Sequence, residues 1–114
     1  MQIQGIYAAL TTKDMAGAEQ FYTTLFGRGP DDRPMDSLIQ WRNVAGANVQ
    51  IFKDEQSAGF GRCTIVVPNM ADARETLAGA GISIGDEVKG DFGKIAQLND
   101  PDGNLITLAE PPSR

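Results

Sequence analysis

The pattern of hydrophobic residues along the chain predicts two strands, each followed by a helix. Residues 5–12 and 62–67 are rich in small apolar and β-branched residues, a composition typical of strands. Each of these segments is followed by a stretch with an apolar stripe at helical spacing. The stripes consist of Met15, Ala18, Tyr22 and Leu25 in the first stretch and of Met70, Ala73, Leu77 and Ala80 in the second.

The residues that flank these stretches indicate where the helices begin and end. Asp14 and Asn69 stand at the N-cap positions, where a short polar side chain accepts a hydrogen bond from the first turn. Gly27 and Gly81 follow the last apolar turns, where glycine takes the left-handed conformation that ends many helices. We therefore expect helices that begin just after residues 14 and 69.

The two halves of the chain are copies of one unit. Adding 55 to the residue numbers carries Asp-Met-Ala-Gly-Ala at 14–18 onto Asn-Met-Ala-Asp-Ala at 69–73. A unit of this length that occurs only twice does not build a solenoid, so we interpret the repeat as an internal duplication. It predicts a single domain of two modules, at about 1–56 and 57–114.

Further strand-like segments follow each predicted helix. They lie near residues 37–43, 47–53, 83–88, 93–98 and 104–110. The polar, Gly- and Pro-rich segments 28–36 and 54–61 are expected to be loops, and the second of them joins the modules. The resulting order predicts an α+β fold of two βαβββ modules, in which one sheet face carries the helices.

Composition excludes several classes of partner. The chain has 114 residues, of which 41% are hydrophobic, and a net charge of −5. Nucleic acid and anionic membrane surfaces are not expected as partners, because an acidic protein does not neutralise phosphates. No secretory signal peptide is visible and no apolar run approaches the ~18 residues of a membrane span.

The single cysteine, Cys63, allows no intrachain disulfide, and the cytoplasm is therefore the expected location. Its place in an apolar strand favours a buried small hydrophobe, with a reactive thiol as the alternative. The chain contains no histidine. Zinc sites, iron sites and nucleophile pairs that need histidine are therefore excluded.

The sequence resembles the glyoxalase / bleomycin-resistance / extradiol-dioxygenase superfamily, also called vicinal oxygen chelate. The resemblance spans essentially the whole chain and rests on three features besides the repeat. These are Phe21-Tyr22, Leu25-Phe26-Gly27, and the turn Asp100-Pro101-Asp102-Gly103-Asn104 before the last strand. It implies a curved, mostly antiparallel sheet with helices on the convex side, a ligand cleft on the concave side, and a homodimer.

The resemblance also implies four cleft positions, which hold metal ligands in metal-dependent members. They correspond to Tyr7, Gln50, Arg62 and Thr107. Strand alternation independently turns these side chains away from their apolar neighbours. A histidine or carboxylate is missing at all four, and arginine offers no lone pair to a cation. We therefore expect no metal and no cofactor.

These four side chains suit a small-molecule ligand. Arg62 presents a planar fork for a carboxylate or phosphate, Tyr7 an aromatic ring with a hydroxyl, and Gln50 and Thr107 neutral hydrogen bonds. Sequestration of a drug or small metabolite is one version of this function. Alternatively, Arg62 forms an internal ion pair or points to solvent, and Tyr7 is a core aromatic.

Three aromatic residues are further candidates. Trp41, in an alternating strand, is a candidate for stacking on a ligand, with a core position as the alternative. Phe92 and Phe60 lie in glycine-flanked loops, where each is a candidate for closing over a pocket or for packing at a subunit contact.

Two other classes of function stay open. One is a metal-free lyase or isomerase that uses Tyr7 and Arg62, although no matching base is evident, since alternation places Glu110 on the opposite face from Thr107. The other is a protein with a vestigial cleft whose role is association.

Overall fold

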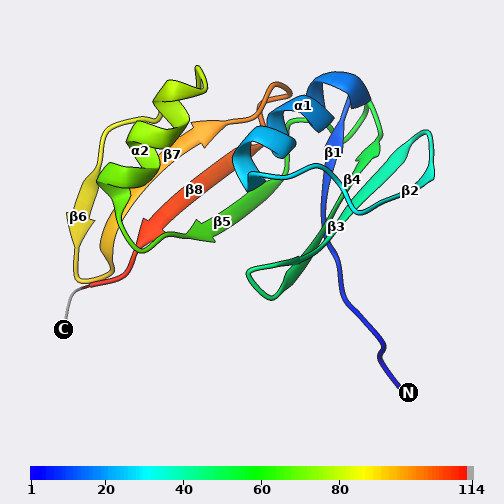
Figure 1. The fold of residues 1–114 in the computed structure, drawn as a ribbon, viewed down its shortest axis with the longest axis horizontal. Helices are drawn as coiled ribbons and strands as arrows, with labels where there is room; N and C mark the ends of the chain where they lie inside the picture. Colours follow the sequence, from blue (N-terminus) through cyan, green and yellow to red (C-terminus); the bar gives the residue numbers. More distant parts are fainter. Residues whose placement is uncertain (113–114) are drawn as a thin grey trace.

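Each half of the chain forms a βαβββ unit in the computed structural model, which describes residues 1–112 (Figure 1). The first half contains β1 (Ala8–Thr12), α1 (Met15–Phe26), β2 (Asp32–Met35), β3 (Leu38–Val44) and β4 (Ala47–Lys53). The second half contains β5 (Arg62–Val66), α2 (Met70–Gly79), β6 (Val88–Gly90), β7 (Gly93–Asn99) and β8 (Leu105–Glu110). The predicted α+β class and the presence of two βαβββ units are confirmed.

The strands form two four-stranded mixed sheets of identical topology. Sheet 1 has the order β1-β4-β3-β2 and sheet 2 has the order β5-β8-β7-β6. β1 pairs in parallel with β4, and β5 pairs in parallel with β8. The remaining pairs are antiparallel. The expectation of one continuous curved sheet is refined by this finding, because no strand ladder joins the two sheets in the described part of the chain.

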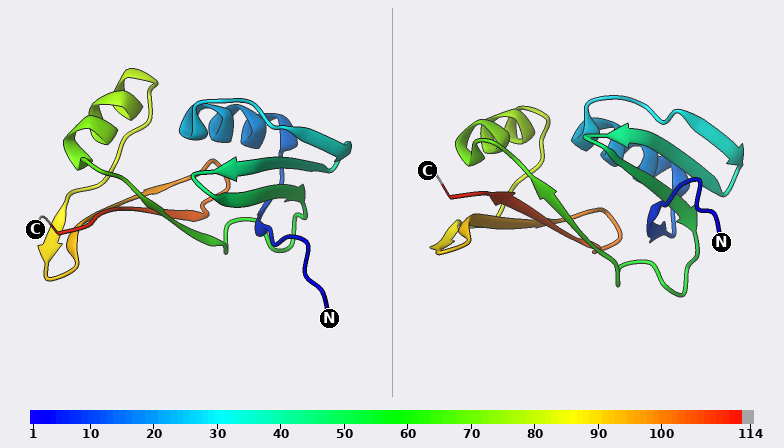
Figure 2. Two further views of the ribbon diagram at one scale, coloured as in Figure 1. Left: turned by 60° about the horizontal axis from the view of Figure 1, so that its bottom comes forward. Right: turned by 90° about the horizontal axis from the view of Figure 1, so that it is seen from below.

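Both helices lie on the same side of the strands (Figure 2). Alternation along the strands therefore gives each sheet a helix-facing side and a side turned away from the helices, which we call its open face. The core lies on the helix-facing side. Its largest fully buried members are Trp41, Tyr22, Ile39, Ile51, Met70, Ile106 and Leu108.

The helix boundaries agree with the sequence. Asn69 caps α2, where its Oδ1 accepts a hydrogen bond from the backbone N–H of Asp72 at 2.9 Å. Asp14 occupies the N-cap of α1, but its side chain makes no capping hydrogen bond. Gly27 ends α1 with φ of 79°, and Gly81, with φ of 82°, follows the end of α2.

Three strand predictions are corrected. The segment 28–36, expected to be a loop, contains β2, which pairs with β3. The predicted strand near 83–88 is irregular, and the pairing with β7 begins only at Val88. The first strand begins at Ala8 and not at residue 5, so Ile6 is 73% exposed and does not reach the helices. These strand boundaries depend on how far each segment pairs with its neighbour, which composition alone does not show.

The Asp-Pro-Asp-Gly-Asn turn between β7 and β8 ties the two modules together. Asp102 accepts hydrogen bonds from the Thr12 hydroxyl at 2.5 Å and from the backbone N–H of Lys13 at 2.9 Å. Asn104, which is fully buried, donates to the backbone carbonyl of Thr11 at 2.9 Å. The turn of the second module is thus anchored on the first strand of the first module.

No helix within residues 1–112 has the length and apolar character needed to cross a membrane.

Candidate functional site

The open faces of the two sheets carry matching rows of polar side chains. On sheet 1, strand register aligns Ala9, Gln50 and Gln40 across β1, β4 and β3. On sheet 2, it aligns Thr64, Thr107 and Gln97 across β5, β8 and β7. The two rows occupy equivalent places because the sheets have the same topology.

Each row contains a side-chain hydrogen bond. Gln40 Nε2 donates to Gln50 Oε1 at 3.4 Å, and Gln97 Nε2 donates to Thr107 Oγ1 at 3.2 Å. These side chains are exposed or half-buried, so their remaining donors and acceptors face outward. Gln50 and Thr107 were predicted from the sequence, whereas Gln40 and Gln97 were missed. The hairpin register, which places each of them opposite a predicted residue, is the signal that could have found them.

Tyr7 lies just before β1 and is half-buried. Strand alternation places it on the same side as Ala9, at the edge of the open face of sheet 1. Its hydroxyl lies near the Arg42 guanidinium, and its influence, followed by that of Asp32, raises the pKa of Arg42. Arg42 Nη1 also lies 3.4 Å from Asp32 Oδ2.

Arg62 is the first residue of β5 and is exposed. It pairs with Leu105 in the register with β8, so it lies on the same face as Thr64 and beside the row that contains Thr107. Within residues 1–112 its guanidinium makes neither an ion pair nor a hydrogen bond, so the alternative of an internal ion pair is not found, whereas an exposed arginine is.

The four predicted residues thus form two pairs on two sheets. Gln50 belongs to sheet 1 and Tyr7 lies just before its strand β1, whereas Arg62 and Thr107 belong to sheet 2. The arginine whose pKa Tyr7 influences is Arg42, which sequence reasoning missed. The alternative of an enzyme that couples Tyr7 to Arg62 therefore gains no support from the geometry.

Trp41 does not line the open face, which corrects the stacking interpretation. Its side chain is completely buried on the helix-facing side, where the ring packs edge-on against Phe26. The indole N–H donates to the backbone carbonyl of Arg28 at 2.9 Å. Tryptophan at this position in β3 is therefore a core residue whose polar atom is already satisfied.

Phe92 lies in the turn between β6 and β7 and is 49% exposed. Its ring packs over the backbone of Gly90, where a methyl group would lie only 2.5 Å from Cε2 of the ring. Part of the ring therefore stays available at the edge of sheet 2, in agreement with a loop position. Whether it touches a ligand stays a prediction.

A shallow pocket of about 250 Å³ lies at the end of β1 where the linker 54–61 crosses the sheet. Its walls include Ala9, Thr11 and Phe52 from the strands and Ser57, Phe60 and Gly61 from the linker. The Ser57 hydroxyl donates to Thr11 Oγ1 at 2.9 Å and holds the linker against the strand. The alternation of β1 and β4 places Ala9, Thr11 and Phe52 on the open face.

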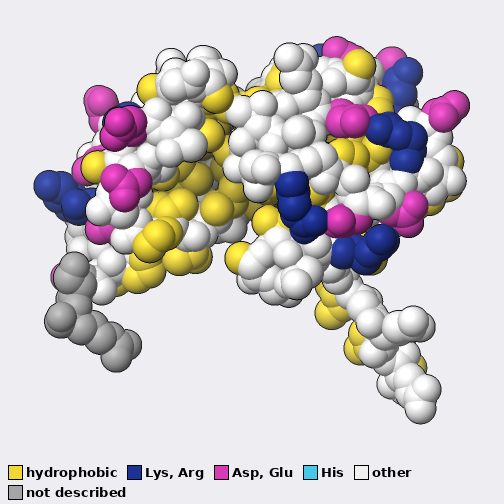
Figure 3. Space-filling view, in the orientation of Figure 1, with side chains coloured by type: hydrophobic (Ala, Val, Ile, Leu, Met, Phe, Trp, Pro, Cys, Tyr) yellow, Lys and Arg dark blue, Asp and Glu magenta, His cyan; other side chains and the backbone are white. Residues whose placement is uncertain are grey.

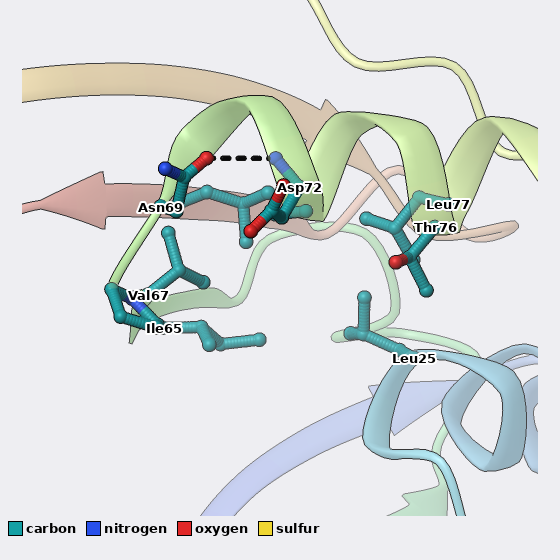
Figure 4. A pocket seen from close by; sticks show the side chains of 10 residues that line it. Leu25, Ile65, Val67, Asn69, Asp72, Thr76 and Leu77 are labelled. Atoms are coloured by element: carbon teal, nitrogen blue, oxygen red, sulfur yellow. Dashed lines mark hydrogen bonds between the residues drawn. The ribbon is translucent and has the colours of Figure 1, made fainter.

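A second pocket, of about 240 Å³, lies on the helix side, between the end of α1 and α2 (Figure 4). Leu25 faces Leu77 across it, and Ile65 of β5 and Val67, just after this strand, point into it. Its lining is mostly aliphatic, with Asn69 and Asp72 at one rim. It lies where hydrophobic side chains gather over β5 and β8 in the space-filling view (Figure 3) and contains none of the predicted site residues.

The chemistry of the four equivalent positions does not fit a metal ion. They present a phenol, an amide, a guanidinium and a hydroxyl, of which only the amide is an ordinary ligand for a hard cation. A guanidinium repels a cation and cannot lose its proton in a protein. In the part of the chain that the structure describes, no three Cys, Asp or Glu side chains come close enough to hold a metal ion.

Comparison with solved structures shows the fold. A glyoxalase / bleomycin resistance protein from Catenulispora Acidiphila DSM 44928 matches with a TM-score of 0.83 and 22% identity, over 95% of this chain and 98% of that one. An antibiotic-binding protein from Streptomyces sp. CB03234 matches with a TM-score of 0.82 and 21% identity, over 98% and 99% of the two chains. A bleomycin-binding protein in complex with bleomycin matches with a TM-score of 0.75 and 20% identity, over 96% and 100%.

Neither protein-family models nor curated protein sequences give a match to this chain. The fold resemblance inferred from the sequence is nevertheless confirmed over nearly the whole chain, because the structural matches cover both modules.

Proposed function

We propose that this protein binds a small organic molecule on the open faces of its two sheets, without a metal ion. The observation that carries the proposal is the pair of matching polar rows, Gln40–Gln50 on sheet 1 and Gln97–Thr107 on sheet 2. Ligand sites combine apolar surface with a few placed polar groups, and the open faces offer both. Phe52 follows Gln50 by two residues and Leu105 precedes Thr107 by two, so each lies on the same open face as its polar neighbour.

The side chains at the four cleft positions support a metal-free site. Tyr7, Gln50, Arg62 and Thr107 hold none of the carboxylates, imidazoles or thiolates that bind divalent metals in proteins. Their hydrogen-bonding groups instead suit a polar organic molecule.

Proteins of the same fold support a role in sequestering a drug or a small metabolite. One solved structure with this fold is a bleomycin-binding protein in complex with bleomycin, and another is an antibiotic-binding protein. We transfer from them the class of function, and not the identity of the ligand.

We further propose that two copies of the chain associate as a homodimer in the cytoplasm. The outer strands of the two sheets, β2 and β6, each pair with one neighbour only in the described part of the chain, and exposed sheet edges favour pairing with another strand. Light scattering coupled to size exclusion would give twice the chain mass if this is correct. A monomer at micromolar concentration would contradict it.

A thermal-shift screen of small acids, amines and neutral compounds, with calorimetry on every hit, tests the binding function. Replacing Gln50 and Gln97 together by alanine should weaken a hit by about tenfold, since two hydrogen-bonding groups are lost. Gln20→Ala, on the exposed side of α1, serves as the matched control and should leave the affinity unchanged. The binding function is wrong if no compound stabilises the protein.

Elemental analysis of the purified protein tests the metal-free part of the proposal. We expect well under one metal ion per chain. Stoichiometric zinc, nickel, manganese or iron would contradict it.

A further inference from the structure

Phe60 is an exposed aromatic residue on a loop that is held in place. Its side chain is 84% exposed. The backbone N–H groups of its two neighbours, Gly59 and Gly61, donate to the same atom, Oδ1 of Asn104, at 3.1 and 2.8 Å. Because Asn104 is completely buried, this double hydrogen bond anchors the loop on the core.

The loop backbone leaves little freedom at this point. Gly59 has a φ of 94°, and a Cβ there would lie 2.5 Å from the carbonyl oxygen of Asp102. A Cβ at Gly61 would lie 2.6 Å from a methyl group of Leu10. Phe60 is therefore presented outward by a fixed backbone, and its exposure does not result from a loosely attached segment.

The exposed ring stands beside an apolar pocket. Phe60 and Phe52 both line the pocket of about 250 Å³ at the end of β1, together with Ala9. Phe52 comes from the open face of β4 and Phe60 from the linker, so the two aromatic side chains belong to different walls. A planar ring placed between them would cover apolar surface on both of its faces.

Arg62 directly follows Gly61, one of the residues that line this pocket. Leu105 N–H donates to the Gly61 carbonyl at 2.9 Å, so the chain is already extended along β8 before β5 begins. Alternation along this extended chain places Arg62 on the same side as Phe60, one strand repeat of ~7 Å away. The Arg62 guanidinium has no carboxylate partner within residues 1–112.

The charge of Arg62 stands out against an acidic protein. The chain carries −5 overall, and the acidic residues of the linker are Asp54 and Glu55, at its other end. The Asp54 carboxylate accepts a hydrogen bond from the backbone N–H of Gln56. Arg62 thus favours an anion locally, against the net negative charge of the protein.

We propose that this site binds an aromatic or similarly planar molecule that carries a carboxylate or another acidic group. The ring lies between Phe52 and Phe60, and the acidic group accepts the paired N–H groups of Arg62. This inference rests on the proposed binding function and adds the chemical class of the ligand. It predicts an anionic ligand and not a cationic one.

Three naphthalenes of matched shape provide the test: 2-naphthoate, 2-naphthamide and 2-naphthylmethylammonium. Calorimetry at low and high salt measures their affinity for the full chain. We expect the anion to bind about tenfold more tightly than the amide and the cation to bind most weakly, because a charge-assisted hydrogen bond is the stronger one. Added salt should weaken the anion alone.

Variants assign the two parts of the site. Arg62→Gln should weaken naphthoate about tenfold and leave naphthamide unchanged, whereas Phe60→Ala should weaken both. Lys89→Gln removes the same charge from the far edge of sheet 2, and Met35→Ala removes another exposed apolar side chain, so both are matched controls. Because Arg62 and Phe60 are exposed, their variants should fold as the parent does.

Several results would overturn the inference. One is tighter binding of the cation than of the anion. Another is an affinity for naphthoate that does not change in Arg62→Gln. A third is a change of oligomeric state in Phe60→Ala with unchanged naphthoate affinity. If none of the three compounds binds while other compounds bind and respond to the Gln50 and Gln97 substitutions, only the ligand class is wrong. If no compound binds at all, the proposed function itself falls.

Discussion

The Tyr22 hydroxyl donates a hydrogen bond of 2.5 Å to Oδ2 of Asp100, which connects the helix of the first module to the turn of the second. Asp100 is buried, and its two oxygens also accept from the backbone N–H groups of Asp102 and Asn104 and from the Asn104 side chain. Burial, followed by the hydrogen bond to Asp100, raises the pKa of Tyr22, so the phenol stays protonated and acts as a donor.

Tyr22→Phe should destabilise the protein by about 1 to 3 kcal/mol, since a buried carboxylate loses one of its donors while the ring itself is kept. Chemical denaturation measures this change in the free energy of unfolding. Phe21→Leu, on the same helix, changes an aromatic ring without touching Asp100 and serves for comparison. A Tyr22→Phe variant as stable as the parent would show that the hydrogen bond contributes nothing net.

Asn104→Asp should be more damaging than its small change in size suggests. The Asn104 amide nitrogen donates to the Thr11 carbonyl and to Asp100 Oδ2, so a second carboxylate would place oxygen against oxygen at both contacts. We expect a loss of about 2 to 4 kcal/mol from two buried hydrogen bonds, measured by urea denaturation. Asn99→Asp, at an exposed position in β7, should cost much less; equal losses would contradict this explanation.

Asp31 should make the protein more sensitive to acid. The backbone N–H of Arg42 and, less strongly, the Arg28 guanidinium lower the pKa of Asp31 below its usual 3.8. A carboxyl whose pKa is lower in the folded state stabilises the fold above the unfolded pKa, and this contribution is lost as the pH falls through the folded pKa. Asp31→Asn should therefore lose less of its urea midpoint between pH 6 and pH 3 than the parent.

Asp36→Asn provides the control for this experiment, because Asp36 is exposed and its carboxylate makes no hydrogen bond within the described residues. It should show the full acid dependence of the parent. The same acid dependence in Asp31→Asn would remove Asp31 as its source.

Cys63 should react slowly with thiol reagents. Burial raises the pKa of the Cys63 thiol, so little thiolate is present at neutral pH, and the half-buried side chain is shielded as well. We expect reaction with a chromogenic disulfide at pH 7 to be slower, on the order of tenfold, in the native protein than in urea. A native rate equal to that in urea would favour the reactive-thiol alternative.

Much of the fold is predictable because duplication doubles each local signal. The helices at Met15–Phe26 and Met70–Gly79 follow from apolar spacing and from capping residues, both of which are local in the sequence. The short strands β2 and β6 are a different case, since all their residues are exposed and they carry no burial pattern. Their existence depends on a neighbouring strand, which composition does not encode.

The residues of the candidate site were predictable only where the alternation of side chains along a single strand was enough to place them. Alternation along single strands correctly placed Gln50 and Thr107 away from the helices, because the period of a strand is local. Gln40 and Gln97 required the register between strands, and the influence of Tyr7 on Arg42 required the path of the chain before β1. For Trp41, alternation in β3 and the buried neighbours decided in favour of the core.

The anchoring turn also shows that the two modules have stopped being interchangeable. The corresponding segment of the first module, from the end of β3 to the start of β4, reads Asn43-Val44-Ala45-Gly46-Ala47 and has Ala47 where the second module has Asn104. It contains no carboxylate that could accept a hydrogen bond from a neighbouring helix. A chain built from two copies of the first module would keep the strand order but lose the hydrogen bonds of the turn that connect the two halves. The two units are therefore not equivalent, because only the second supplies the turn that binds the other.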